Sequence, residues 1–327
     1  MSPTSYQLLH PAMWAQIYVL LHLKQTTTKK IFFSMHKAGF VNILGLPNMG
    51  KSTLLNAVFG EKLAIVTPKA QTTRHRMIAV YNEDDLQIVF SDTPGIIQKT
   101  HYKMQESMMA EIKPAFEDAD VFVWVHDAKT PTEGLEEILK KIDNSKIPTL
   151  VVINKVDLCT QEQLLKSVEH WHSLLPKAEI LPISALEGLN LDLLLKKVKS
   201  WLPEAPAYYD KEELSDRPMR YFVTEIIREK IFLSFQQEIP YSCEVVINSY
   251  KEKDGLDAIE AYIIVERDSQ KNIIIGKGGE KIKHLGIDAR KEIEAFLQKR
   301  VFLNLQVKVD KDWRNNPAKL KRYGFTE

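Results

Sequence analysis

A glycine-rich segment near position 50 combines the residue types that bind phosphate. The string Gly45-Leu46-Pro47-Asn48-Met49-Gly50-Lys51-Ser52 matches G-x-x-x-x-G-K-[ST] at every fixed position. Glycines let backbone N–H groups point at phosphate oxygens, Lys51 can reach the β- and γ-phosphates, and the Ser52 hydroxyl can ligate Mg²⁺. The segment predicts a nucleoside triphosphate site without identifying the base. We expect the phosphates to be bound by Gly45, Asn48, Met49, Gly50, Lys51, Ser52 and Thr53.

Two later segments supply groups for the γ-phosphate and its metal. In Asp92-Thr93-Pro94-Gly95, the aspartate can hold the hydration shell of Mg²⁺ and the Gly95 N–H can meet the γ-phosphate. Between the two motifs lies Gln71-Thr72-Thr73-Arg74, in a region where a threonine closes on Mg²⁺ when a triphosphate is bound. We favour Thr73 over Thr72 for that role, by analogy with the Thr-Thr-Arg pattern of a protein family that this sequence resembles. The predicted catalytic residues are Lys51, Thr73, Asp92 and Gly95, and the predicted Mg²⁺ ligands are Ser52, Thr73 and Asp92.

The base is predicted from Asn154-Lys155-Val156-Asp157. The Asp157 carboxylate can accept two hydrogen bonds from guanine N1–H and the guanine amino group, which adenine cannot supply, so this motif argues against the alternative of an ATPase. We expect Lys155 to pack along the base and Asn154 to support the loop. Further on, Ser184-Ala185-Leu186 is expected to offer the Ala185 N–H to guanine O6. Together these motifs predict a GTP/GDP site.

The segments before these motifs have the character of buried strands. Residues 40–44, 86–90 and 149–153 are short apolar runs rich in branched side chains, as is typical of a parallel sheet covered on both faces. Residues 53–59 form a predicted helix that ends at Gly60. The pattern predicts an α/β fold in which a mostly parallel sheet is flanked by helices.

A second region begins after the proline-containing stretch at 203–210. Helical spacing over residues 220–235 is followed by strand-like runs at 242–250 and 258–266, a short segment at 272–275, a helix at 280–299 and a strand at 301–307. Between the last two helices stands Gly276-Lys277-Gly278-Gly279, where a nucleic-acid backbone can approach closely. We expect an apolar groove beside this loop, with Ile274 and Ile275 nearby, to hold unstacked bases. The predicted RNA-binding residues are Ile275, Gly276, Lys277, Gly278, Gly279, Lys281 and Lys283.

Charge supports this prediction only when it is counted by region. The 327 residues contain 44 Lys+Arg and 43 Asp+Glu, and a net charge of +1 argues against a nucleic-acid partner. Residues 271–327 alone hold 14 basic and 7 acidic residues, a net of +7, whereas residues 217–270 have a net of −3. We therefore predict an RNA-binding surface with salt-dependent affinity that extends into a basic tail. The tail residues are Arg314, Lys319, Lys321 and Arg322.

These motifs resemble those of the Era family of translation-factor-related GTPases, and the second region resembles a type II KH domain, a smaller α+β fold. The resemblance rests on Gly-x-Pro-Asn-x-Gly-Lys-Ser, residues 69–76 and Asp-Thr-Pro-Gly-Ile, and it extends from about residue 35 to the C-terminus. It implies a Mg²⁺-dependent GTPase that binds the 3′ region of small-subunit (16S) ribosomal RNA and assists assembly of the small (30S) subunit. A GTPase of tRNA modification or of the membrane, with a protein docking module, is the alternative.

The resemblance also bears on hydrolysis and location. Ile96 stands where Ras-like proteins carry a glutamine that orients water, so we expect slow hydrolysis assisted by K⁺ near Asn48. We expect a cytoplasmic protein and take a monomer as the default, and the resemblance implies in addition a peripheral fraction at the inner membrane. Two separated cysteines, Cys159 and Cys243, fit a reducing compartment, and no apolar run is long enough to span a membrane.

The predicted domain organisation has two folded parts. Residues 35–203 form the GTPase domain, 204–216 a linker and 217–327 the KH domain with its basic tail. Residues 1–34 contain no acidic side chain, and we predict that they are disordered or that translation begins at Met35.

Overall fold

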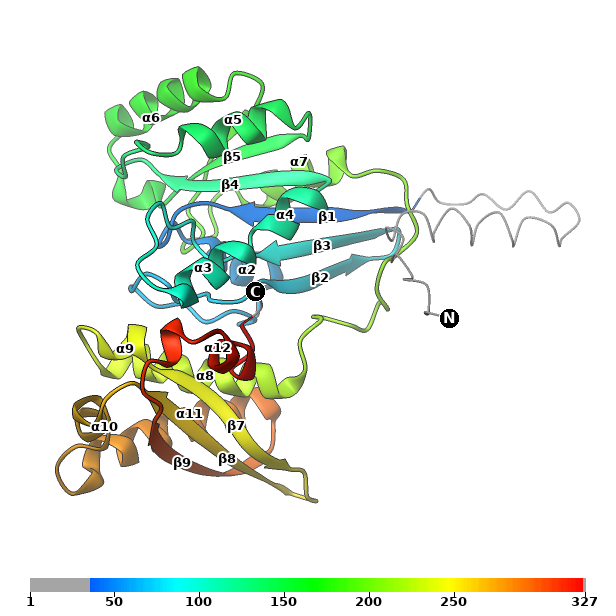
Figure 1. Ribbon diagram of the computed structural model, residues 1–327. Helices are drawn as coiled ribbons and strands as arrows, with labels where there is room; N and C mark the ends of the chain where they lie inside the picture. Colours follow the sequence, from blue (N-terminus) through cyan, green and yellow to red (C-terminus); the bar gives the residue numbers. More distant parts are fainter. Residues whose placement is uncertain (1–35, 326–327) are drawn as a thin grey trace, which may run out of the picture.

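The computed structural model describes residues 36–325, so the predictions for residues 1–34 lie outside it. A six-stranded sheet of order β2-β3-β1-β4-β5-β6 is the centre of the larger domain (Figure 1). Only β2 runs antiparallel to its neighbour, so the expectation of a mostly parallel sheet is confirmed. The strands are β1 Lys37–Leu44, β2 Met77–Glu83, β3 Leu86–Asp92, β4 Val121–Asp127, β5 Thr149–Asn154 and β6 Glu179–Pro182.

Helices cover both faces of this sheet. Residues of α2 and α7 enter the core on one face, whereas α4, α5 and α6 contribute to the core on the other. The helix after the glycine-rich loop begins at Lys51, two residues before the predicted start, and its C-cap is Gly60 in the left-handed conformation, which confirms the predicted end. The helices are α2 Lys51–Phe59, α3 Lys103–Ala110, α4 Lys113–Glu117, α5 Glu136–Asn144, the 3₁₀ turn η1 Val156–Leu158, α6 Gln161–Leu174 and α7 Leu191–Trp201.

The parallel strands bring the sequence motifs to one edge of the sheet. The glycine-rich loop follows β1, Asp92 ends β3 and Asn154 ends β5. Ile43 pairs with Asp92 and Asp127 pairs with Asn154, so these strands end at the same level along the strand direction. Since ligands of open α/β sheets bind beyond the carboxyl ends of the strands, this edge is where a nucleotide is expected.

The smaller domain has the predicted order α-β-β-α-α-β. Its three strands pair as β7-β8-β9, with β7 antiparallel and β9 parallel to β8. Apolar residues of α8, α10 and α11 pack on the sheet. The elements are α8 Met219–Ser234, α9 Ile239–Ser242, β7 Glu244–Lys251, β8 Leu256–Val265, α10 Asp268–Ile275, η2 Lys277–Gly279, α11 Glu280–Leu297, β9 Arg300–Val309, η3 Trp313–Asn315 and α12 Pro317–Arg322.

The connection between the domains lies against the larger one. Val80 N–H donates to Leu214 O (2.9 Å), and Gln87 Oε1 accepts from the Tyr208 backbone N–H (2.6 Å). Figure 1 shows this segment passing beside the sheet before it enters α8. The predicted linker is therefore attached along the larger domain rather than spanning open space.

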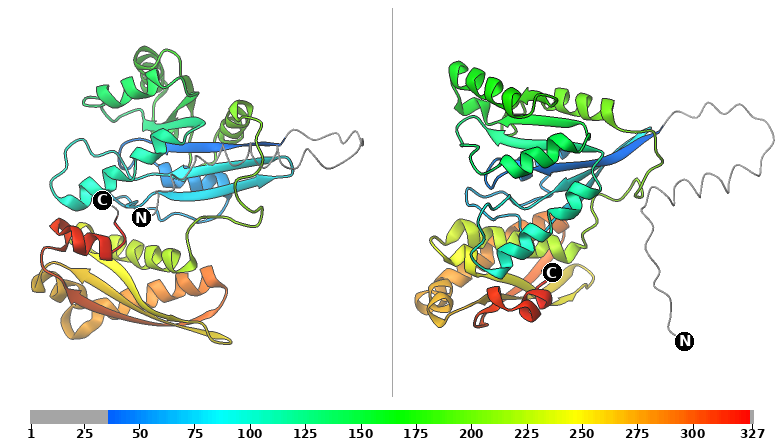
Figure 2. Two further views of the ribbon diagram at one scale, coloured as in Figure 1. Left: turned by 45° about the vertical axis from the view of Figure 1, so that its right-hand side comes forward. Right: turned by 45° about the horizontal axis from the view of Figure 1, so that its top comes forward.

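The C-terminal tail has a packing role that its sequence did not predict. Trp313, Leu320 and Phe325 are buried and pack with Met104 and Met108 of α3, so η3 and α12 lie between the domains (left view of Figure 2). In addition, Arg314 pairs with Glu266, and Lys319 pairs with Asp310. Arg314 and Lys319 are therefore paired with carboxylates of the smaller domain, and their place on an RNA surface stays a prediction. Lys321 and Arg322 are exposed.

Candidate functional site

The glycine-rich loop is shaped by close contacts with the strand beside it. Gly45 has φ 147°, and a Cβ atom there would lie 2.2 Å from the carbonyl oxygen of Val125. Lys51 is buried, and its ammonium donates to Gly45 O (3.2 Å) and Leu46 O (2.9 Å). Burial lowers the pKa of Lys51 to about 8, although Asp92 opposes that shift. The loop thus holds a cation at the position where we predict phosphate binding.

Three oxygen-bearing side chains meet beside this loop. Ser52 Oγ donates to Asp92 Oδ2 (2.7 Å) and lies 3.0 Å from Thr73 Oγ1, which in turn lies 3.4 Å from Asp92 Oδ2. Burial raises the pKa of Asp92, while hydrogen bonding from Ser52 acts against that rise. Within residues 36–325, Asp92 Oδ1 is buried and has no hydrogen-bond partner. Hard oxygen ligands around an unpartnered carboxylate oxygen fit Mg²⁺.

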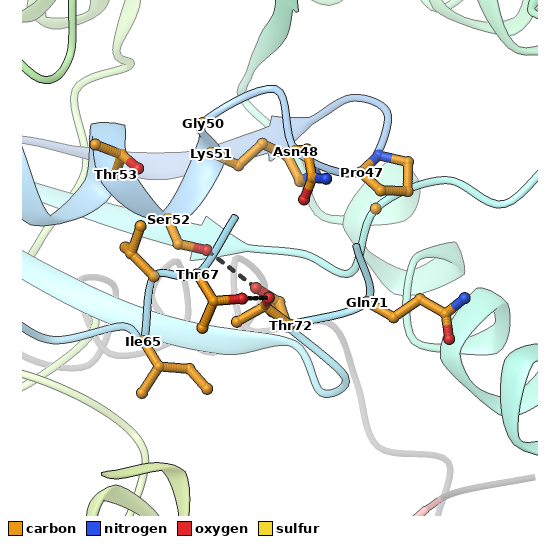
Figure 3. Close-up of a pocket in the computed structure, with 13 residues that line it drawn as sticks. Pro47, Asn48, Gly50, Lys51, Ser52, Thr53, Ile65, Thr67, Gln71 and Thr72 are labelled. Carbon is orange, nitrogen blue, oxygen red and sulfur yellow. Dashed lines mark hydrogen bonds between the residues drawn. The ribbon is translucent and has the colours of Figure 1, made fainter. Parts of the chain in front are cut away.

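The two candidate threonines have different partners. The Thr72 hydroxyl donates to Lys69 O (2.7 Å) and lies 2.7 Å from Thr67 Oγ1, whereas Thr73 faces Ser52 and Asp92. Figure 3 shows this segment facing the glycine-rich loop across a pocket that both segments line. The geometry is in accord with the choice of Thr73, whose role as a metal ligand stays a prediction.

The Asp-Thr-Pro-Gly turn lies directly against the loop. A Cβ atom at Gly95 would lie 2.6 Å from Pro47 N, so glycine is needed for this approach. The next residue, Ile96, donates its N–H to Gly45 O (3.1 Å), and its side chain is buried in the core. An isoleucine held there cannot orient an attacking water, as we expected from its type.

Asn154 connects the loops expected around the base. Its side chain donates to Met49 O (2.9 Å) and accepts from Ala185 N–H (3.0 Å). The Ala185 N–H, for which we predicted guanine O6 as the acceptor, is therefore bonded to Asn154 in this structure. The buried Ser184 hydroxyl accepts from Glu187 N–H (3.2 Å), and Leu186 and Asp157 are exposed.

Sequence reasoning missed Asp127 at this site. Its carboxylate accepts from Lys155 Nζ (3.2 Å), and Lys155 also donates to Asn48 O (2.6 Å). Backbone N–H groups of Lys129 and Thr130 donate to the other carboxylate oxygen of Asp127. An available signal was its position at the end of a buried strand, the same position that drew attention to Asp92.

The glycine loop of the smaller domain is open to solvent. Gly276, Gly278 and Gly279 all have positive φ, and a Cβ atom at Gly278 or Gly279 would have no neighbour within 4 Å among the described residues. Lys277, Lys281 and Lys283 are exposed near the start of α11. The loop therefore offers cationic side chains and a helix N-terminus to an approaching phosphate.

The two isoleucines expected near the groove differ in burial. Ile274 is completely buried in the core of the smaller domain and is not available to bases. Ile275 is half-buried, and its neighbour Ile273 is 41% exposed. Successive residues of a helix point in different directions, and packing of α10 on the sheet turns Ile274 inward.

None of the helices formed by residues 36–325 has both the length and the apolar character needed to cross a lipid bilayer.

Comparison with known proteins gives two family models in chain order. Residues 40–155 match the model of a 50S ribosome-binding GTPase, and residues 238–314 match that of a KH domain. A relative from Zea mays, "GTPase ERA1, chloroplastic", is 44% identical over 294 residues, which cover 89% of this chain and 71% of the relative. A relative from Oryza sativa subsp. japonica, "GTPase ERA-like, chloroplastic", is also 44% identical, over 89% of this chain and 70% of its own.

Solved structures match across both domains. A crystal structure of Era in complex with MgGDPNP and nucleotides 1506–1542 of 16S ribosomal RNA is 40% identical, with a TM-score of 0.85 over 89% of this chain and all of that chain. A single-residue variant of Aquifex aeolicus Era bound to GDP·AlF₄⁻ gives a TM-score of 0.84 at the same identity and coverage. The nucleotide motifs lie at one edge of the sheet, and a KH domain follows them in the sequence. The chain therefore belongs to the Era family of GTPases.

Proposed function

We propose that this GTPase is an RNA-binding switch that binds the 3′ region of 16S ribosomal RNA and assists assembly of the 30S subunit. The observation that carries the proposal is the open glycine loop with Lys277 exposed on it, in a chain whose larger domain bears a complete set of guanine-nucleotide motifs. The related Era crystal structure, which holds nucleotides 1506–1542 of that RNA, supports the choice of RNA.

Within the larger domain, we propose that the side chains act by position and charge. Ser52, Thr73 and Asp92 would hold Mg²⁺, which when bound neutralises charge on the phosphate oxygens. Lys51 and the Gly95 N–H would stabilise negative charge as it develops during phosphoryl transfer. Asp157 would select guanine, and Asn154 and Lys155 would hold the base loops against the phosphate loop.

We also propose that K⁺ assists hydrolysis beside Asn48. Asn48 has φ 63°, and its amide nitrogen donates to Pro68 O (3.2 Å), which leaves the amide oxygen as the ligand that it could offer. A cation there would supply positive charge near the phosphates, in a site where the apolar Ile96 side chain supplies no polar group. Turnover in KCl should exceed turnover in NaCl at equal ionic strength, and equal rates would contradict this part of the proposal.

RNA binding is tested by placing negative charge on the loop. The double variant Lys277→Asp/Gly278→Asp should lose binding to the 3′ segment of 16S RNA, because carboxylates would repel the phosphates, while GTP turnover is kept. Lys253→Asp/Gly255→Asp is a matched control: Gly255 also has positive φ (75°), and a Cβ atom there would have no described neighbour within 4 Å. Full RNA affinity in the loop variant would favour a protein docking module instead.

Crosslinking in cells followed by sequencing of the bound RNA tests the identity of the partner. We expect fragments from the 3′ end of 16S RNA, and enrichment of tRNA fragments would favour the alternative function. RNA affinity measured with a GTP analogue should also differ from affinity measured with GDP. Identical affinities would contradict the proposed switch.

The remaining proposals concern organisation and location. We propose domain boundaries at residues 35–203 and 217–327, a monomeric state, and a cytoplasmic location with a peripheral fraction at the inner membrane. Cys159 and Cys243 are both free, which supports a reducing compartment. Cell fractionation tests the location, and recovery in an organelle, as the name of the maize relative suggests for that protein, would overturn the cytoplasmic assignment.

A further inference from the structure

The segment that carries Thr73 is bonded on both sides to the smaller domain. On one side, the carbonyl oxygen of Thr72 accepts from the guanidinium of Arg228 on α8 (2.5 Å). On the other side, the Arg74 guanidinium donates to Cys243 O (2.7 Å), Glu244 Oε2 (2.7 Å) and Pro240 O (2.8 Å). The backbone before Thr73 and the side chain after it are thus both held by the second domain.

These contacts are buried. Arg74 and Arg228 are each 1% exposed, and Glu244 is 4% exposed. Breaking one partner of a buried ion pair leaves an uncompensated charge in a medium of low polarity, so such contacts resist rearrangement. Although burial acts to raise the pKa of Glu244, Arg74 and then Arg228 hold it below its ordinary value. Glu244 is therefore ionised at neutral pH and available to Arg74.

The arginines are themselves held in place. Arg228 Nε donates to Glu225 Oε1 (2.8 Å), and Arg228 Nη2 donates to Glu225 Oε2 (2.5 Å). The Phe232 ring lies beside both guanidiniums, with Arg74 Cζ at 5.7 Å and Arg228 Cζ at 5.4 Å from its centroid. Few rotamers satisfy all of these contacts, so the backbone around Thr73 has a defined position.

We propose that Arg228 and Glu244 are positioning residues of the GTPase site, although they belong to the KH domain. By holding Thr72 and Arg74, they keep Thr73 Oγ1 beside Ser52 and Asp92, where it closes on Mg²⁺·GTP. The inference rests on the metal-ligand role proposed above for Thr73. It assigns to the second domain a part in hydrolysis itself, in addition to binding RNA.

The test uses the full chain with Arg228→Gln, Arg228→Lys and Glu244→Gln. GTP turnover should fall about tenfold in Arg228→Gln, because a displaced ligand weakens the transition state. The Mg²⁺ concentration for half-maximal turnover should rise, whereas GDP affinity and guanine selectivity should stay unchanged. Arg228→Lys should restore part of the turnover, since it keeps one cationic donor near Thr72 O. Glu244→Gln, which preserves shape, should lower turnover less than Arg228→Gln does.

Lys62→Gln is the matched control. Lys62 forms ion pairs across the same domain boundary with Glu229 (2.6 Å) and with Glu292, but the structure shows no bond from it to residues 72–74. Normal turnover and Mg²⁺ dependence in folded Arg228→Gln and Glu244→Gln would overturn the inference, as would an equal loss in Lys62→Gln. If Arg228→Gln does not fold, Glu244→Gln decides the question by the same measurements.

Thr73→Ala separates the inference from the role on which it rests. If Thr73→Ala keeps normal turnover and Mg²⁺ dependence, the metal-ligand role of Thr73 fails, and the inference fails with it. If Thr73→Ala is impaired while the Arg228 and Glu244 variants are normal, only the positioning inference is wrong.

Discussion

The two glycine loops of this protein differ in what makes glycine necessary. A Cβ atom at Gly45 would lie 2.2 Å from Val125 O, inside the protein's own backbone. A Cβ atom at Gly278 would have no neighbour within 4 Å among the described residues. The nucleotide loop needs glycine because of packing that exists before any ligand binds. At Gly278 the second loop needs glycine for a backbone angle, φ 62°, and the surface there is left to a partner.

The lysines of the two loops differ in the same way. Lys51 is buried and bonded to two carbonyl oxygens of its own loop, whereas Lys277 is exposed. A buried lysine with defined partners is preorganised to bind a phosphate at a fixed position. An exposed lysine can adjust its side chain to the phosphates of a flexible RNA backbone. The nucleotide site is thus built into the core of the larger domain, whereas the RNA loop lies on the surface of the smaller one.

The largest effect is expected for Gly45→Ala. The methyl group would displace the β4 backbone or the loop, and we expect a loss of about 3 kcal/mol in the free energy of unfolding together with loss of GDP binding. Urea denaturation and nucleotide titration measure the two effects. If Gly45→Ala has an unchanged free energy of unfolding, packing is not the reason that the nucleotide loop needs glycine, and the contrast between the two loops is wrong.

A smaller effect is expected for Asn154→Ala, which tests whether the base loops belong to the core. The substitution leaves Met49 O and Ala185 N–H without their partner, and we expect about 2 kcal/mol of destabilisation with weaker binding of both GTP and GDP. Asn248→Ala is the control, because Asn248 is exposed and its amide donates to Glu260 within the sheet of the smaller domain. Equal losses in the two variants would contradict the assigned role.

The smallest effect on stability is expected for Gly278→Ala. An alanine at φ 62° costs about 1 kcal/mol. RNA affinity should fall because the methyl group occupies the surface that faces the backbone, while GTP turnover is unchanged. Gly255→Ala at φ 75° should show a similar loss of stability with normal RNA affinity. RNA binding measured at two salt concentrations and thermal unfolding distinguish these outcomes.

Features of the fold that depend on a few consecutive residues could be predicted, and features that depend on contacts between distant segments could not. The buried strands at residues 40–44, 86–90 and 149–153 were found because their apolar character lies within a few consecutive residues. The inward direction of Ile274 was missed, because in a short helix the neighbouring isoleucines are interchangeable until the sheet is present. The packing of the tail was not predicted for a similar reason, since Trp313 and Leu320 pack against α3, which is distant in the sequence.

The sequence by itself determined the phosphate loop, the guanine motif and the order of elements in the second domain, because those features depend on spacing along a continuous stretch of chain. Tertiary structure alone decided how Thr73 is held. Thr72 and Arg228 are 156 positions apart, and Arg74 and Glu244 are 170 apart. A contact of that separation exists only after both domains have folded, and its strength comes from burial, which local sequence does not encode.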